Sequence, residues 1–246
     1  MTALQHISAA RESRTTNNIE AMTLLVVYHL RSTSSHGIWY MIGLAMRTCI
    51  DLGMHRKSNE RGFADDVADS RRRLFWTVYY LERMIAISLG RPLSISDRQI
   101  DLPLPKAEGI AADLFRLRRI ESKIYNSVYR ADKPLTALVF KLDRLYQELE
   151  SWRAQLVESS SGDLNYPMLH YNRAVRLLIQ PFLPLLSPSD SYHGICLRAA
   201  GDICQAHKRL HQSLDYGHSF IAVQTVFVAG SVSSTDLASV ASVVSR

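Results

Sequence analysis

Residues 135–156 read LTALVFKLDRLYQELESWRAQL, and this stretch carries the clearest structural signal in the sequence. Its apolar residues alternate in steps of three and four, at Leu135, Leu138, Leu142, Leu145, Leu149, Trp152 and Leu156. That spacing places them on one face of an α-helix. Pro134 stands at the start, where its missing N–H costs nothing. Such a repeat can also form a dimer seam, but three heptads are short, so we favour a bundle core over a zipper.

The same periodicity recurs outward from this stretch along most of the chain. Gly53 and Gly90 stand where left-handed C-terminal caps belong, and Pro92 strengthens the second stop. We find no alternation typical of strands and no Asn-Gly hairpin signal. The sequence therefore predicts an all-α fold, an irregular array of about seven or eight helices. Besides 135–156, we expect helices at about 18–31, 36–52, 71–89, 111–129, 168–179, 192–214 and 218–229.

Composition excludes several classes of protein. The chain has 246 residues, of which 47% are hydrophobic and 21% charged, as in a globular protein of one large or two small domains. Three cysteines cannot build a disulfide framework or a six-cysteine zinc cluster, and their odd number fits a reducing compartment. No run reaches the ~18 apolar residues of a membrane span. The net charge of +6 permits an anionic partner without demonstrating one.

An acidic motif suggests one kind of enzyme. Asp65, Asp66 and Asp69 match DDxxD, with which all-α prenyl-chain synthases hold magnesium against a diphosphate. The second acidic motif that these enzymes need is absent, and carboxylates just ahead of a helix are stabilised by its dipole without any metal. We therefore expect a protein that is not an enzyme, and keep the magnesium-dependent isoprenoid enzyme as the alternative.

Two further patterns have a structural and a chemical interpretation. Cys204, His207 and His211 fall on one helix face and are weak candidates for a zinc site, but apolar residues share that face and favour a core. The basic run 71–73 could contact phosphate, yet we expect its arginines to pair with acids nearby. We find no nucleophile elbow, P-loop or dinucleotide motif, so no catalytic residue is assigned.

Four short boxes resemble one family. LGMHR at 52–56, RRRLFW at 71–76, GRPLSI at 90–95 and DLPLP at 101–105 follow in order. Together with weaker matches over about 19–230, they resemble the regulatory domain, or middle homology region, of fungal transcription factors of the zinc binuclear cluster type. Glu82 stands where the family usually has Asp, and Gln180 where a basic residue often precedes Pro-Phe.

The resemblance implies an all-α, non-catalytic domain that acts in the nucleus. We expect a flexible lead at 1–17, a partial regulatory domain at 18–230 and a loose tail at 231–246. Because the family binds DNA through a separate zinc cluster that these residues do not contain, we expect no cofactor in this chain and no direct DNA binding by it. The missing zinc cluster is expected if the chain is a truncated paralogue, a fragment or the product of a misjudged gene model.

We expect the boxes to hold the helices together. The predicted structural signature comprises Gly53, His55, Arg73, Trp76, Gly90, Arg91 and Pro92, with Arg73 and Arg91 paired to acids of the loop 97–101. Trp76 and its neighbours would bury large apolar areas. Between helices, an effector pocket is predicted from Trp39, Tyr79, Tyr80 and Met84, which core packing explains equally well.

The expected function is regulation of transcription. A non-enzymatic module would bind a small-molecule effector, the transcription machinery or a homodimer partner, and would shift between two packings of different affinity. Family members often control metabolic or biosynthetic gene sets, including secondary metabolism. An inert remnant that competes for dimer partners is a further alternative, and no membrane partner is expected.

Overall fold

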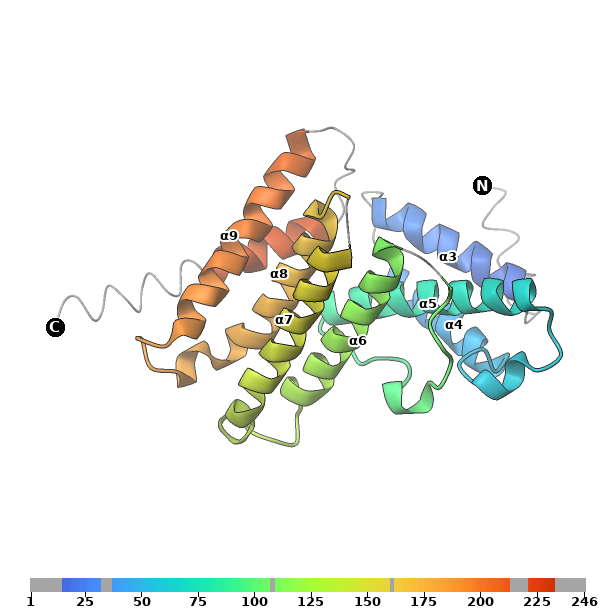
Figure 1. Cartoon of the computed structure of the whole chain (residues 1–246), viewed down its shortest axis with the longest axis horizontal. Helices are drawn as coiled ribbons and strands as arrows, with labels where there is room; N and C mark the ends of the chain where they lie inside the picture. The colour runs from blue at the N-terminus through green and yellow to red at the C-terminus, as the bar shows by residue number, and fades with distance from the viewer. Residues whose placement is uncertain (1–14, 32–36, 107–108, 160–161, 213–220, 233–246) are drawn as a thin grey trace. The chain divides into compact units, whose positions relative to one another are not determined.

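A computed structural model describes residues 15–31, 37–106, 109–159, 162–212 and 221–232, and these ranges are helical with connecting turns and no strand (Figure 1). The prediction of an all-α array is confirmed for them. The α-helices are α3 (Thr16–Arg31), α4 (Ile38–Asp51), α5 (Asp65–Ser88), α6 (Ile110–Val128), α7 (Leu142–Ser159), α8 (Asn165–Ile179), α9 (Ser191–Gln212) and a further helix at 221–232. Short 3-10 helices are η1 (Lys57–Glu60), η2 (Asp97–Gln99), η3 (Leu135–Lys141) and η4 (Gln180–Leu185).

The chain divides into two compact units, Met1–Glu108 and Gly109–Arg246. This division lies inside the range 18–230 that the sequence analysis treats as one regulatory domain. Most of the predicted lead at 1–17 and tail at 231–246 falls outside the described residues, although α3 already begins at Thr16. None of the helices described is long and apolar enough to cross a membrane.

In the first unit, α3, α4 and α5 pack against one another. Their facing apolar side chains are fully buried, as the 0% exposure of Val26, Ile42 and Phe75 shows for the three helices in turn. After α5 the chain runs without regular structure, except for η2, from residue 89 to 106. This return segment carries two of the four boxes.

In the second unit, α8 contacts α6, α7 and α9 and is therefore the central helix. The stripe predicted at 135–156 is buried here, with Leu149 and Leu156 at 0% exposure. Trp152 donates its indole N–H to the carbonyl of Asp113 at 2.8 Å and stacks on Tyr171. The interpretation of the stripe as a bundle core is confirmed.

Two helix starts differ from the prediction. The stripe at 135–156 begins as the 3-10 helix η3 and becomes α-helical at Leu142. Helix α5 begins at Asp65, six residues before the predicted Arg71, so Asp65 and Asp66 lie in its first turn rather than ahead of it. Carboxylates in a first turn are stabilised by the positive end of the helix dipole, which favours the earlier start.

Candidate functional site

One face of α5 holds the return segment 89–106 through side chains. Asp69, Trp76, Tyr79, Glu82 and Arg83 recur at helical spacing along this face, and we call them the α5 clamp. Four of these side chains are less than 2% exposed, and Asp69 is 8% exposed. Side chains at such spacing share one side of a helix. The clamp therefore lies along the segment that contains the GRPLSI and DLPLP boxes.

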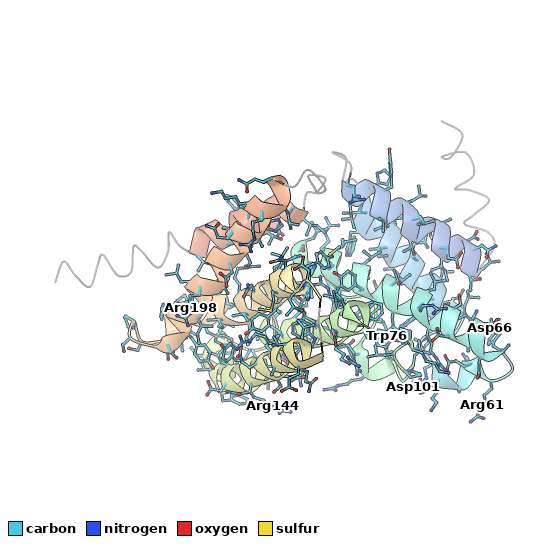
Figure 2. All side chains as sticks on the ribbon, turned by 45° about the horizontal axis from the view of Figure 1, so that its top comes forward. Arg61, Asp66, Trp76, Asp101, Arg144 and Arg198 are labelled. Carbon is cyan, nitrogen blue, oxygen red and sulfur yellow. The ribbon has the colours of Figure 1, made fainter. Side chains whose placement is uncertain are left out.

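The clamp binds mostly backbone atoms of the return segment. Trp76 donates its indole N–H to the carbonyl of Pro103 at 2.8 Å. Glu82 accepts the N–H of Ser94 at 2.7 Å, and Asp69 accepts the N–H of Lys106 at 3.0 Å. A segment without regular structure cannot pair its own backbone N–H and C=O groups with one another, so these hydrogen bonds to α5 fix its path. Figure 2 shows Trp76 among the side chains of this unit.

Arg83 is the buried centre of the clamp. Its guanidinium pairs with Glu82 at 2.5 Å and with Asp97 at 3.4 Å, and it donates to the carbonyl of Ile95 at 2.6 Å. It also lies 4.2 Å from the ring centroid of Tyr79, whose hydroxyl donates to Asp97 at 2.7 Å. Burial opposes the charge, but Glu82, Tyr79 and Asp97 together outweigh it, so the pKa of Arg83 is raised. The cation thus ties α5 to the GRPLSI box.

The LGMHR box also contacts the return segment. The carbonyl of His55 accepts the N–H groups of Asp101 and Leu102, each at 3.3 Å. Asp101 in turn pairs with Arg56 at 3.3 Å and accepts the N–H of Lys57 at 2.8 Å. Burial and then the charge of Arg56 lower the pKa of the half-buried His55. All four boxes therefore meet in the first unit.

The glycines of the boxes adopt the conformation expected of them. Gly53 and Gly90 both have φ of 64°. The N–H of Met54 bonds to the carbonyl of Cys49, and that of Arg91 to the carbonyl of Ala86. These are the bonds of a left-handed helix end. Pro92, which follows, is exposed.

The expected pairing of Arg73 with an acid of the loop 97–101 is not what the structure shows, whereas that of Arg91 stays a prediction. Arg73 pairs with Asp69, one turn earlier on α5, at 2.8 Å. The guanidinium of Arg91 lies 4.6 Å from the ring centroid of Trp39. Arg83 reaches the loop acid Asp97. For Arg73 the reason is distance, because a partner one turn away on the same helix is met before a remote loop.

Local pairing of the basic run 71–73 is confirmed. Arg72 holds Glu60 through two hydrogen bonds of 2.5 and 2.7 Å, and Arg71 lies 4.6 Å from the ring centroid of Phe63. A guanidinium engaged by two parallel bonds is geometrically fixed. The run thus serves the packing around α5.

The predicted effector pocket is distributed over two helices. Trp39 on α4 is half-buried, as are Tyr80 and Met84 on α5, whereas Tyr79 is buried in the clamp. Trp39 contacts Tyr40 edge-on and has Arg91 over its ring. Their joint action as a pocket stays a prediction.

The acidic motif does not present three open carboxylates. Asp65 and Asp66 are exposed, but Asp69 is buried and already accepts from Lys106 and Arg73. On α9, Cys204 and His207 are half-buried, and the side chain of His211 lies outside the described residues. Within the described part of the chain, no group of three or more His, Cys, Asp or Glu side chains could hold a metal ion.

Comparison with known proteins places the boxes in a family. The model of the fungal specific transcription factor domain matches residues 2–110, almost the same range as the first unit, which ends at Glu108. This chain carries that domain. The clamp, the return segment and the glycine caps at Gly53 and Gly90 all lie inside the matched range.

The proteins that are similar to this chain are named as regulators. An uncharacterized transcriptional regulatory protein of Saccharomyces cerevisiae is 32% identical over 93% of this chain and 19% of its own length. The pyrimidine pathway regulatory protein 1 of the same yeast is 26% identical over 84% of this chain and 27% of its own. The positive regulator of purine utilization of Emericella nidulans is 32% identical over 86% and 30%. No solved structure matches.

The chain thus spans between a fifth and a third of the length of these curated relatives. The family and the relatives belong to a non-enzymatic class, in agreement with the expectation from the sequence. Nothing among them favours the isoprenoid enzyme.

Proposed function

We propose that this chain works as the regulatory module of a fungal transcription regulator that acts in the nucleus. The observation that carries the proposal is the match of residues 2–110 to the fungal specific transcription factor domain. Similarity to the yeast transcriptional regulatory protein over 93% of the chain supports extending the assignment to the second unit. The module would sense a signal and change the output of a promoter.

The clamp supports a module with a defined shape. Asp69, Glu82 and Asp97 are engaged by backbone N–H groups, by arginines or by Tyr79, so their charges organise the first unit itself. A buried network of this kind favours one packing over its alternatives. Regulation would then consist of a ligand or partner binding one packing better than another.

Metabolic gene sets are the proposed targets. The names of the relatives refer to the pyrimidine pathway, to purine utilization and, in Schizosaccharomyces pombe, to thiamine repressible genes. By analogy, the proposed partners are a small metabolite as effector and either the transcription machinery or a second copy of the chain. The side chains Trp39, Tyr80 and Met84 stay the candidates for an effector contact in the first unit.

A tethering experiment tests the proposal. The whole chain is fused to a heterologous DNA-binding domain, and reporter output and cellular location are measured in cells grown with and without purines, pyrimidines or thiamine. We expect a nuclear fusion whose output differs from that of the DNA-binding domain alone. An intact fusion in the nucleus that leaves reporter output unchanged in every medium would contradict the proposal.

A further inference from the structure

The second unit contains a half-buried arginine, Arg176, that forms no ion pair among the described residues. Arg176 lies on α8 and donates from Nη1 to the side-chain oxygen of Gln180, a neutral partner, at 2.6 Å. Its Nε is buried and bonds to nothing among the residues described. No ion pair of Arg176 occurs among them either. The guanidinium is thus engaged by one neutral amide.

The carboxylate that acts electrostatically on Arg176 is already paired with another arginine. Glu121 on α6 forms an ion pair with Arg118 one turn away, and both side chains are 3% exposed. Arg118 also bonds to Nδ1 of His170 at 2.9 Å. Glu121 acts on Arg176 electrostatically, together with Tyr129 and Cys196, neither of which is a carboxylate. Because Glu121 is paired with Arg118, it is not a dedicated counter-ion for Arg176.

This arrangement is electrostatically incomplete. A guanidinium stays charged in proteins, and a charge withdrawn from water is normally paired. Burial lowers the pKa of Arg176, and the opposing effects of Tyr129, Cys196 and Glu121 do not cancel it. Arg176 is nevertheless only half-buried as a whole residue, so a small solute can approach it from solvent.

We propose that Arg176, with Gln180 beside it, forms a binding site for an oxyanion, the carboxylate or phosphate group of a small metabolite. Such a group accepts two parallel hydrogen bonds from a guanidinium and supplies the missing negative charge. The amide of Gln180 can turn to donate its own N–H to the same ligand. That this ligand is the effector rests on the proposed function, whereas binding itself does not.

The test measures binding to the whole chain, independently of transcription. Thermal unfolding is followed in inorganic phosphate and, separately, in sodium acetate, with sodium chloride holding ionic strength constant. A bound oxyanion raises the unfolding midpoint saturably, by roughly 3–6 °C at ten times its dissociation constant. A rise in phosphate alone identifies a phosphate site, and one in acetate alone a carboxylate site.

Three variants locate the effect. Arg176→Gln should show no rise in the unfolding midpoint. Arg176→Lys should bind the anion about tenfold more weakly, because an ammonium cannot donate two parallel hydrogen bonds as a guanidinium does. Arg198→Gln should respond as the wild type does. Arg198 is an exposed arginine of α9, labelled in Figure 2, and serves as the matched control. In chloride alone, Arg176→Gln should unfold at the wild-type midpoint or above it, because it removes an uncompensated charge.

Three results would overturn the proposal. The first is an equal rise in the wild type and in Arg176→Gln, which would mean that the anions act on the whole surface. The second is an unchanged dissociation constant in Arg176→Lys. The third is a midpoint several degrees lower for Arg176→Gln in chloride, which would assign Arg176 to the folding of the unit rather than to a ligand.

Discussion

At the scale of single residues, Trp76 combines apolar burial with one hydrogen bond. Its side chain is 1% exposed, contacts the rings of Phe75 and Tyr79 edge-on, and donates to the carbonyl of Pro103. Tryptophan in such a position has both its ring and its N–H satisfied. Trp39, in contrast, is half-buried beneath Arg91.

We expect Trp76→Ala to lower the free energy of unfolding by about 3–5 kcal/mol, because it leaves a cavity and an unpaired carbonyl. Denaturant unfolding measures the loss, and Trp39→Ala, a truncation of the same side chain at a half-buried position, should cost less. A loss below about 1 kcal/mol for Trp76→Ala would show that this ring is not part of the core.

Gly53 and Gly90 share a φ of 64° but differ in their surroundings. A Cβ at Gly53 would lie 1.9 Å from Nδ2 of Asn59, which donates to the carbonyl of Gly53, whereas a Cβ at Gly90 would meet nothing within 4 Å. Backbone strain alone costs about 1–2 kcal/mol for a residue with a side chain.

We therefore expect Gly90→Ala to lower the free energy of unfolding by about 1 kcal/mol, and Gly53→Ala to lower it by about 1 kcal/mol more, through displacement of Asn59. Denaturant unfolding of both variants measures the difference. In an Asn59→Ala background the two glycine substitutions should cost the same. Equal losses in the wild-type background would mean that Asn59 moves aside freely.

At the scale of elements, α5 is organised by the ion pair of Arg83 and Glu82, which are 0% and 1% exposed. Removing one member of a buried pair leaves the other as an uncompensated charge. We expect Arg83→Met to cost about 3–5 kcal/mol in unfolding free energy, measured by denaturant melts. The double variant Arg83→Met, Glu82→Gln should recover a large part of that loss. No recovery would mean that Arg83 acts through its other partners, Ile95 and Asp97.

The contact between α6 and α8 makes stability depend on pH. Burial, followed by the charges of Arg118, Arg173 and His207, holds the pKa of His170 well below its ordinary value of 6.5. Below about pH 6.5 the unfolded chain therefore binds a proton that the folded chain does not, and the free energy of unfolding falls as the pH falls.

Between pH 6.5 and 5, we expect His170 to lower the free energy of unfolding by at most about 1.4 kcal/mol for each pH unit. His170→Asn keeps an acceptor for Arg118 and should reduce the slope of unfolding free energy against pH by that amount. An unchanged slope in the variant would assign the acid sensitivity to other groups, such as His55 and His207, whose pKa values are also lowered.

The positions of most elements could be predicted from the sequence, because apolar periodicity and glycine stops are local signals. The buried stripe of α7 and the caps at Gly53 and Gly90 are of this kind. The start of α5 at Asp65 could not be predicted in this way, because its first turns are mostly polar and so lack an apolar period.

The centre of the site could not be predicted in the same way. Arg83 lies in an apolar stretch of α5, and its partners Ile95 and Asp97 stand more than ten residues away. Bonds from a side chain to a remote backbone carbonyl leave no pattern in the sequence. The one available signal was an Arg next to a Glu in the middle of a buried helix, where an ionic pair needs a structural reason.

At the scale of the whole molecule, the family match and the first unit coincide, since one ends at residue 110 and the other at Glu108. The clamp and all four boxes lie within that unit, whereas Arg176 lies in the second. We therefore propose that the packing held by the α5 clamp in the first unit serves regulation, and that an oxyanion site lies in the second unit.

The measurement that tests this account most directly is the reporter output of the tethered chain in clamp variants. Arg83→Met should abolish the difference between the fusion and the DNA-binding domain alone, and Arg61→Gln should preserve it. Arg61 is an exposed arginine of the same unit, labelled in Figure 2. Full regulation by Arg83→Met at wild-type protein levels would contradict the claim that the packing held by the α5 clamp is what regulates transcription.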